Sequence, residues 1–155
     1  MNGDNTVKTV ALSDGYWGSL GHGVGAIVSY AVLGLVLVML GFAVLDLTTP
    51  GTLRRLVRDG KPNAVAVSAS GILAVALIVV FAIYSANGRL AEGLIAATAY
   101  GLTGIVALMI AGRIAEQVLG VDVGELLAAE TLRPQAWAVA VTHLALGLVI
   151  AVSIL

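Results

Sequence analysis

The residue best suited to chemistry is His143, about halfway along the apolar run Ala136 to Leu155. Imidazole exchanges a proton near neutral pH, and an ionisable side chain inside a long apolar segment marks a candidate functional site. The functional interpretation is a proton relay or the polar lining of an oligomeric pore. The structural alternative is a neutral histidine hydrogen-bonded to a hydroxyl on a neighbouring helix. The hydroxyls considered are those of Ser68, Ser70, Thr98 and Thr103, and we take His143, Thr103 and Ser70 as the candidate intramembrane polar site.

A second candidate lies in the segment TTPGTLRRLVRDGKPNAVAV, Thr48 to Val67, which carries half of the chain's eight Lys and Arg residues. Its basic residues are Arg54, Arg55, Arg58 and Lys61. We expect a short helix here, capped by Thr52 and ended by Gly60, with its apolar face resting on the membrane surface. The basic residues then act either as an orientation signal alone or also as contacts to anionic lipid, at about 1 kcal/mol each.

Other chemistry is poorly supported by the sequence. It has no cysteine, its two histidines, His22 and His143, are far apart, and its carboxylates fall in loops and at the ends of apolar runs. No Gly-rich phosphate loop opens a helix. We therefore expect no enzyme, no metal site and no cofactor. A formal net charge of -1 also argues against nucleic-acid binding.

The elements that hold these residues follow from composition. Hydrophobic residues make up 59% of the chain and charged residues 11%, against about 25% charged in a typical soluble domain. Four uncharged runs are each long enough to cross a bilayer, which needs roughly 20 helical residues. We predict an all-α polytopic membrane protein with a polar tail at 1–20 and a four-helix domain at 21–155. The predicted spans are 23–46, 63–87, 91–113 and 134–155, with amphipathic elbows at 52–60 and 122–131.

The basic residues also predict an orientation, because Lys and Arg are enriched in loops that stay in the cytoplasm. The first and third connections carry six of them, whereas the N-terminal tail and the second connection carry only Lys8 and Arg89. We therefore expect both termini on the non-cytoplasmic side of a bacterial inner membrane.

The two halves of the chain have similar sequence patterns, which indicates an internal repeat. An offset of about 72 residues aligns Pro62-Asn63-Ala64 with Pro134-Gln135-Ala136. In the second elbow Asp122 and Glu125 have the spacing of a capping box, and each proline suits the first turn of a helix. The prediction is two parallel repeats of a helical hairpin.

These motifs carry a family resemblance. The stretches DLTTPGTLRRLV, GKPNAVAVSASGILAVALIV and LRPQAWAVAV resemble the YjfL family of small bacterial inner-membrane proteins, built from two copies of a hairpin domain of unknown function. The resemblance covers the chain from about Val32 to its C-terminus. It implies an integral membrane protein and supplies no catalytic residues.

Small residues spaced four apart let helices approach closely in lipid, and they are frequent here, as in the pair Gly21 and Gly25. Our leading hypothesis is a non-enzymatic scaffold or accessory subunit that works through helix-helix assembly, as a homo-oligomer or within a larger membrane complex, with membrane lipids as its other partners. The alternative is a small oligomeric ion or proton channel that uses His143.

Overall fold

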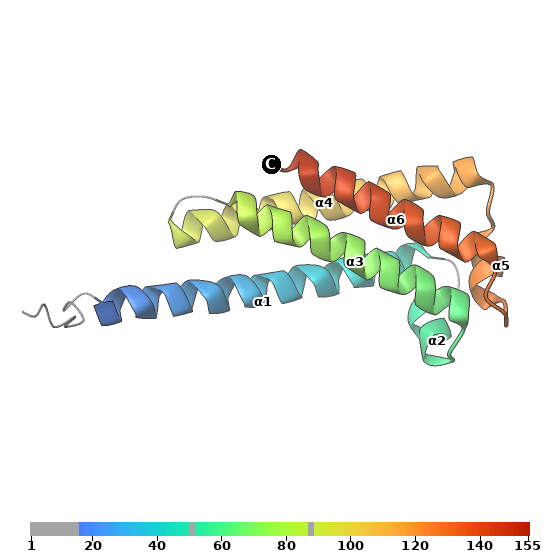
Figure 1. Ribbon diagram of the computed structural model, residues 1–155, viewed down its shortest axis with the longest axis horizontal. Helices are drawn as coiled ribbons and strands as arrows, with labels where there is room; N and C mark the ends of the chain where they lie inside the picture. Colours follow the sequence, from blue (N-terminus) through green and yellow to red (C-terminus); the bar gives the residue numbers. More distant parts are fainter. Residues whose placement is uncertain (1–15, 50–51, 87–88) are drawn as a thin grey trace, which may run out of the picture.

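The computed structural model describes residues 16–49, 52–86 and 89–155, and these residues form six helices (Figure 1). The helices are α1 (Tyr16–Thr48), α2 (Leu53–Arg58), α3 (Pro62–Ser85), α4 (Leu90–Leu119), α5 (Val123–Ala128) and α6 (Pro134–Ser153). Each half of the chain is thus a long helix, a six-residue helix and a second long helix that begins with proline. The long helices run back and forth beside one another, with α2 and α5 at the same end of the molecule, which we call the elbow end.

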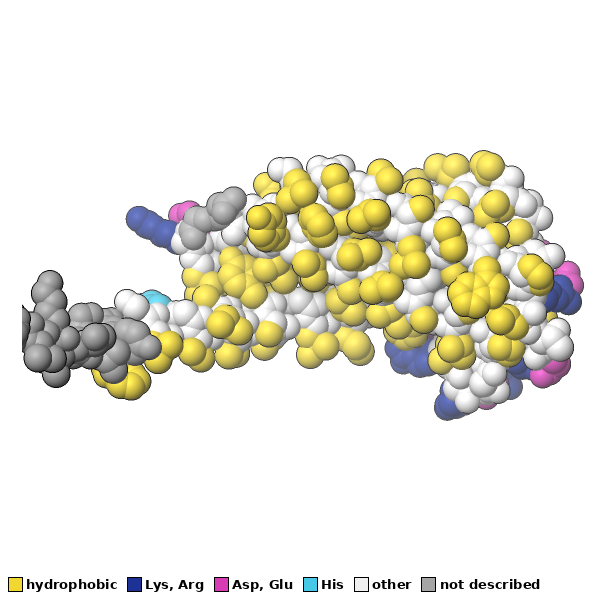
Figure 2. Space-filling view, viewed as in Figure 1, with side chains coloured by type: hydrophobic (Ala, Val, Ile, Leu, Met, Phe, Trp, Pro, Cys, Tyr) yellow, Lys and Arg dark blue, Asp and Glu magenta, His cyan; other side chains and the backbone are white. Residues whose placement is uncertain are grey.

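The long helices α1, α3, α4 and α6 are each long and apolar enough to cross a membrane. Figure 2 shows apolar side chains over their length, while most Lys, Arg, Asp and Glu side chains gather at the elbow end. Helices satisfy their own backbone hydrogen bonds, as a chain in lipid must. The predicted all-α fold with four long apolar helices is confirmed.

Two helices are longer than the predicted spans. Residues 1–15 of the predicted tail lie outside the described residues, but α1 already begins at Tyr16. Helix α4 continues past Arg113 to Leu119, because the intervening Arg, Ala, Glu and Gln residues favour helix even where they are charged or polar. It ends at Gly120, whose φ of 64° is the left-handed conformation that glycine adopts at helix ends. Helix α3 ends at Ser85 and Ala86 is its C-cap residue, whereas residue 87, the last of the predicted span, lies outside the described residues.

Helix α3 is central and contacts each of the other five helices. Its most extensive contact is with α6, where a Cβ added at Gly147 would lie 2.6 Å from the Cβ of Ala74. Helix α4 approaches α3 through Gly104, where a Cβ would lie 2.3 Å from Ile78. The bundle therefore depends on glycine at these crossings, as close helix packing in lipid requires.

The elbow helices pack on the bundle. Leu53 of α2 and Leu127 of α5 are fully buried in one apolar cluster with Ala64 and Val67 of α3. The apolar face of α2 thus packs on the bundle, with Leu53 fully buried and Leu56 and Val57 partly buried, and its place on the membrane surface stays a prediction.

The caps of the two elbows differ. Thr52 is the N-cap residue of α2, as predicted, but its φ is 45° and its side chain makes no capping hydrogen bond. The preceding break at Pro50 and Gly51 lies outside the described residues. Gly60 has a φ of 74° and follows the C-cap residue Asp59, which agrees with its predicted place at the end of α2. In the second elbow Asp122 accepts a hydrogen bond from the Glu125 amide at 3.0 Å, as its spacing predicts.

A buried asparagine at the start of α3 joins the two halves. The amide of Asn63 donates to the carbonyl oxygens of Ala129 and Thr131 at 3.3 and 2.8 Å, and its oxygen accepts from the Arg133 amide at 2.8 Å. Its exposure is 0%. An ion pair between Lys61 and Glu130 lies beside these bonds. The α5–α6 connection is thereby fixed to the start of α3.

Replacing Asn63 by alanine removes the partner of three backbone groups. Because an unsatisfied buried polar group costs about 1–3 kcal/mol, we expect Asn63→Ala to lower the free energy of unfolding by about 2–3 kcal/mol, measured by denaturant titration in detergent micelles. Gln135, at the equivalent position of the repeat, is exposed, so Gln135→Ala is the matched control and should change stability by less than about 0.5 kcal/mol. Equal effects of the two substitutions would contradict the role given to Asn63.

Candidate functional site

His143 is buried at 6% exposure and lies between α3 and α4. Its Nδ1 is 3.5 Å from the Ser70 hydroxyl oxygen on α3. That hydroxyl donates its own proton to the Val67 carbonyl at 2.8 Å, so its oxygen is free to accept from the ring of a neutral histidine. The structure thus brings together His143 and Ser70, two of the three candidate residues.

The other hydroxyls do not join this pair. Thr98 donates to the Leu94 carbonyl of its own helix, and within the described part of the chain the buried Ser68 hydroxyl has no hydrogen-bond partner. Thr103 is exposed and lines a separate groove of about 490 Å³ between α4 and α6, together with Tyr100 and Ser153. The predicted set His143, Ser70 and Thr103 is therefore divided between two places.

A small cavity lies next to His143. A Cβ added at Gly112 would be 3.8 Å from Nε2 of His143, so the missing side chain leaves space on the α4 side of the ring. The cavity measures about 20 Å³ and is lined by Thr48, Thr49, Arg113 and Glu116 in addition to apolar groups. That is room for about one water molecule.

The cavity also brings charged groups close to His143. The sequence offers no obvious charged group at the depth of His143, but Arg113 and Glu116 line the same cavity. The two form an ion pair at 3.3 Å, and the Glu116 side chain is only 18% exposed. His143 lies halfway along α6, yet it is level with the charged last turns of α4.

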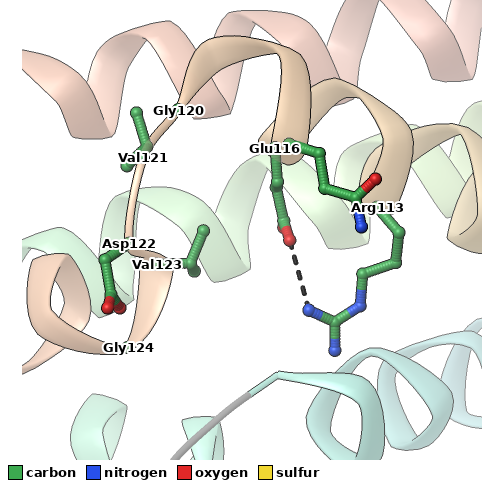
Figure 3. Close-up of a pocket in the computed structure, with 8 residues that line it drawn as sticks. Arg113, Glu116, Gly120, Val121, Asp122, Val123 and Gly124 are labelled. Atoms are coloured by element: carbon green, nitrogen blue, oxygen red, sulfur yellow. Dashed lines mark hydrogen bonds and ion pairs between the residues drawn. The ribbon is translucent and has the colours of Figure 1, made fainter.

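The same ion pair borders a wider pocket at the elbow end. This pocket has a volume of about 390 Å³ and is lined by Arg113, Glu116 and the loop that joins α4 to α5. Figure 3 shows the Arg113–Glu116 pair on one side and Asp122 with Val123 and Gly124 on the other. The pocket and the cavity at His143 share Arg113 and Glu116 in their linings, and we call the pocket, the ion pair and the cavity together the polar inlet.

The polar inlet is closed on its inner side. Beyond His143, towards the other end of the bundle, Ala74, Ile78, Leu108 and Ala151 belong to one apolar cluster, and each is at most 4% exposed. A dry, close-packed cluster of this kind leaves no room for a file of water. Within the described residues the polar inlet therefore extends from the elbow end to His143, and the apolar cluster begins beyond it.

The polar inlet could not be predicted from the sequence, because Arg113 and Glu116 lie at the predicted end of a span, where exposed ion pairs are common. The available signal was their spacing of three on a helix whose preceding residue is Gly112. A glycine next to a charged pair in the last turns of a helix leaves room for a side chain from a neighbouring helix, here His143.

The basic residues of the first elbow are also divided. Arg54, Arg55 and Arg58 line a pocket of about 400 Å³ together with Asp46 and Thr52, whereas Lys61 is paired with Glu130 of the second elbow. Among the described residues, no three His, Asp or Glu side chains gather as a metal site would require.

The polar inlet predicts that a thiol at position 143 is reachable by a water-sized ion. The natural chain has no cysteine, so single cysteines can be tested one at a time. Silver ions added in detergent should block His143→Cys, so that a maleimide added after unfolding in SDS labels it weakly. Ala151→Cys, on the same helix at 0% exposure in the apolar cluster, should remain fully labelled. Equal protection of the two thiols would contradict the inlet.

Comparison with known proteins supports the membrane assignment. The family described as Domain of Unknown Function (DUF350) matches residues 19–154. UPF0719 transmembrane proteins of Mycobacterium bovis and Mycobacterium tuberculosis are each 39% identical over 134 residues, which is 86% of this chain and 88% of each relative. A UPF0719 transmembrane protein of Mycolicibacterium paratuberculosis is 33% identical over 133 residues, 85% of this chain and 88% of that protein. No solved structure matches this chain.

These matches support the expected class of membrane protein, although they do not support the YjfL name. The four long apolar helices and the relatives, which are named as transmembrane proteins, agree with each other. The chain belongs to the DUF350 family of transmembrane proteins.

Proposed function

We propose that this protein is a non-enzymatic scaffold or accessory subunit of the bacterial inner membrane, which assembles with a second copy of itself through the outward face of α1. The observation that carries the proposal is the contrast between glycines inside and outside the bundle. Glycines of α3, α4 and α6 are used at helix crossings within the chain, whereas Gly18, Gly21 and Gly25 of α1 have nothing within 4 Å.

The position of these glycines on α1 supports an external partner. With 3.6 residues per turn, Gly18, Gly21 and Gly25 share one face, roughly opposite the face of Leu37 and Leu45, which packs on the bundle. Helix α1 also projects past the other helices at the end away from the elbows (Figure 1). A small-residue face turned away from its own bundle is suited to the close approach of another helix.

The side chains beside these glycines are apolar and exposed. Trp17, Val24 and Val28 are 67%, 52% and 55% exposed. A second α1 packed here would cover them while its backbone approached over the glycines. A non-enzymatic role fits a chain in which most of the described carboxylates form ion pairs or caps at helix ends, and whose buried histidine lies beside Ser70 and a cavity with room for about one water molecule.

Orientation is part of the proposal. The first and third connections, which contain the elbows, carry six basic residues, and this excess favours the cytoplasmic side. Both termini would then lie on the non-cytoplasmic side. Lys8, one of the two basic residues counted for the opposite side, lies outside the described residues.

A leucine on the outward face of α1 should weaken self-association. We expect Gly25→Leu to reduce the dimer fraction at least tenfold in concentration-dependent native mass measurements in detergent, because the added side chain separates the helix backbones. Gly23→Leu is the matched control: it makes the same change in a glycine with the same open surroundings, on a different face of α1. A wild-type protein that stays monomeric, or equal losses in both variants, would contradict self-assembly through this face.

The alternative function, a small ion or proton channel that uses His143, rests on the cavity between His143 and the Arg113–Glu116 pair. The closed apolar cluster beyond His143 argues against a path through one chain. A path between two copies would not be lined by His143, because its ring points into the bundle at 6% exposure.

The channel alternative is tested by measuring proton flux across liposome membranes. Liposomes that contain the pure protein should show no proton leak above protein-free liposomes between pH 5 and pH 8, the range over which imidazole ordinarily titrates, and His143→Leu should change nothing. The readout is a pH-sensitive dye trapped inside the liposomes. A pH-dependent leak that His143→Leu abolishes would favour the channel over the scaffold.

A further inference from the structure

We infer that the first elbow contains a defined binding site for the phosphate of an anionic phospholipid, formed by Arg54, Arg55 and Arg58. The three arginines line a single pocket of about 400 Å³ with Asp46 and Thr52, and all three are exposed. The planar guanidinium group donates paired hydrogen bonds in a geometry that matches phosphate oxygens. This site does not depend on the proposed self-association.

The pocket is held in place by contacts between α1 and α2. The Arg54 amide donates to the Asp46 carboxylate at 2.8 Å, and the Arg54 guanidinium lies 5.9 Å from the centre of the Phe42 ring. Phe42 in turn packs against the apolar cluster under the elbows. The start of α2 is thus fixed to the end of α1, and less ordering is required when a ligand binds.

The charge balance of the pocket favours an anion. Arg55 is paired with Asp59 at 3.7 Å, whereas Arg54 and Arg58 have no carboxylate within salt-bridge distance among the described residues. The Asp46 carboxylate is occupied by the Arg54 amide. The pocket lining holds three guanidinium groups and the Asp46 carboxylate, and Asp59 pairs with one of the guanidinium groups, which leaves one net positive charge for a phosphate diester to neutralise.

The surroundings point to a lipid as the source of the phosphate. The nearby end of α1 exposes apolar side chains, with Met39 at 58%, Leu40 at 41% and Leu47 at 84%. Figure 2 shows the basic side chains of the elbow directly beside the apolar surface of α1. A phospholipid can place its phosphate among the arginines and its acyl chains along α1, whereas a free phosphate contacts only the arginines.

Lys61 is excluded from this site, although the sequence grouped it with the arginines. Its ammonium is paired with Glu130, and it does not line the pocket. Replacing Lys61 removes the same charge from the same elbow as replacing one of the arginines. Comparing the two variants therefore distinguishes a defined site from a general attraction between a basic loop and an anionic surface.

The test measures lipid binding to the full-length protein by native mass spectrometry in a neutral detergent, with phosphatidylglycerol as the probe and phosphatidylcholine as the uncharged comparison. We expect Arg54→Gln and Arg58→Gln each to weaken phosphatidylglycerol binding about fivefold, and the double variant about thirtyfold. Lys61→Gln should bind as the wild type does. Arg133→Gln in the second elbow is a further control, needed if Lys61→Gln is poorly folded.

Three results would overturn the inference. They are an equal loss of binding in the arginine variants and in the Lys61 and Arg133 controls, equal binding of phosphatidylglycerol and phosphatidylcholine, and full displacement of the lipid by millimolar inorganic phosphate. The last result would identify a soluble phosphate as the ligand. Gly25→Leu should bind phosphatidylglycerol as the wild type does, because the lipid site does not depend on self-association.

Discussion

The arrangement of the molecule depends on how closely α3 approaches its neighbours. Hydrophobic burial gives helices little reason to associate in lipid, so contact area and local hydrogen bonds must hold them together. Ala74 meets Gly147 of α6, and Ile78 fills the space left by Gly104 of α4. These contacts need small residues at the crossings. At the elbow end Asn63 adds the polar connection that fixes the second half of the chain to the first.

The close packing around α3 also decides where polar chemistry can occur. The crossings of α3 with α4 and α6 are tight, and the apolar cluster beyond His143 is buried. Near the elbow end Gly112 leaves space beside the ring, and there a cavity reaches His143. The same packing leaves α1 on the outside, attached to α3 and α4 from about Tyr30 onward. Its first turns, with Gly18, Gly21 and Gly25, are therefore the surface available to a partner.

Much of the fold follows from the sequence because length and hydrophobicity alone define a helix that can cross a membrane, and Pro62 and Pro134 mark helix starts. The sites were less predictable because they depend on tertiary contacts. Lys61 and Glu130 are 69 residues apart, so the pairing that removes Lys61 from the arginine pocket has no local signal. Asn63 and Gln135 are equivalent in the repeat, yet only Asn63 is buried, because the α5–α6 connection folds back over the start of α3.

The central claim, that the outward face of α1 binds a second copy, is tested most directly by disulfide cross-linking in native membranes. The chain has no natural cysteine, so each single-cysteine variant can cross-link only to its own equivalent in another copy or to a foreign thiol. The account predicts that Gly21→Cys yields a covalent homodimer on mild oxidation and that Gly23→Cys, on another face of the same helix, yields little. Dimer formation by both variants alike, or by neither, would contradict it.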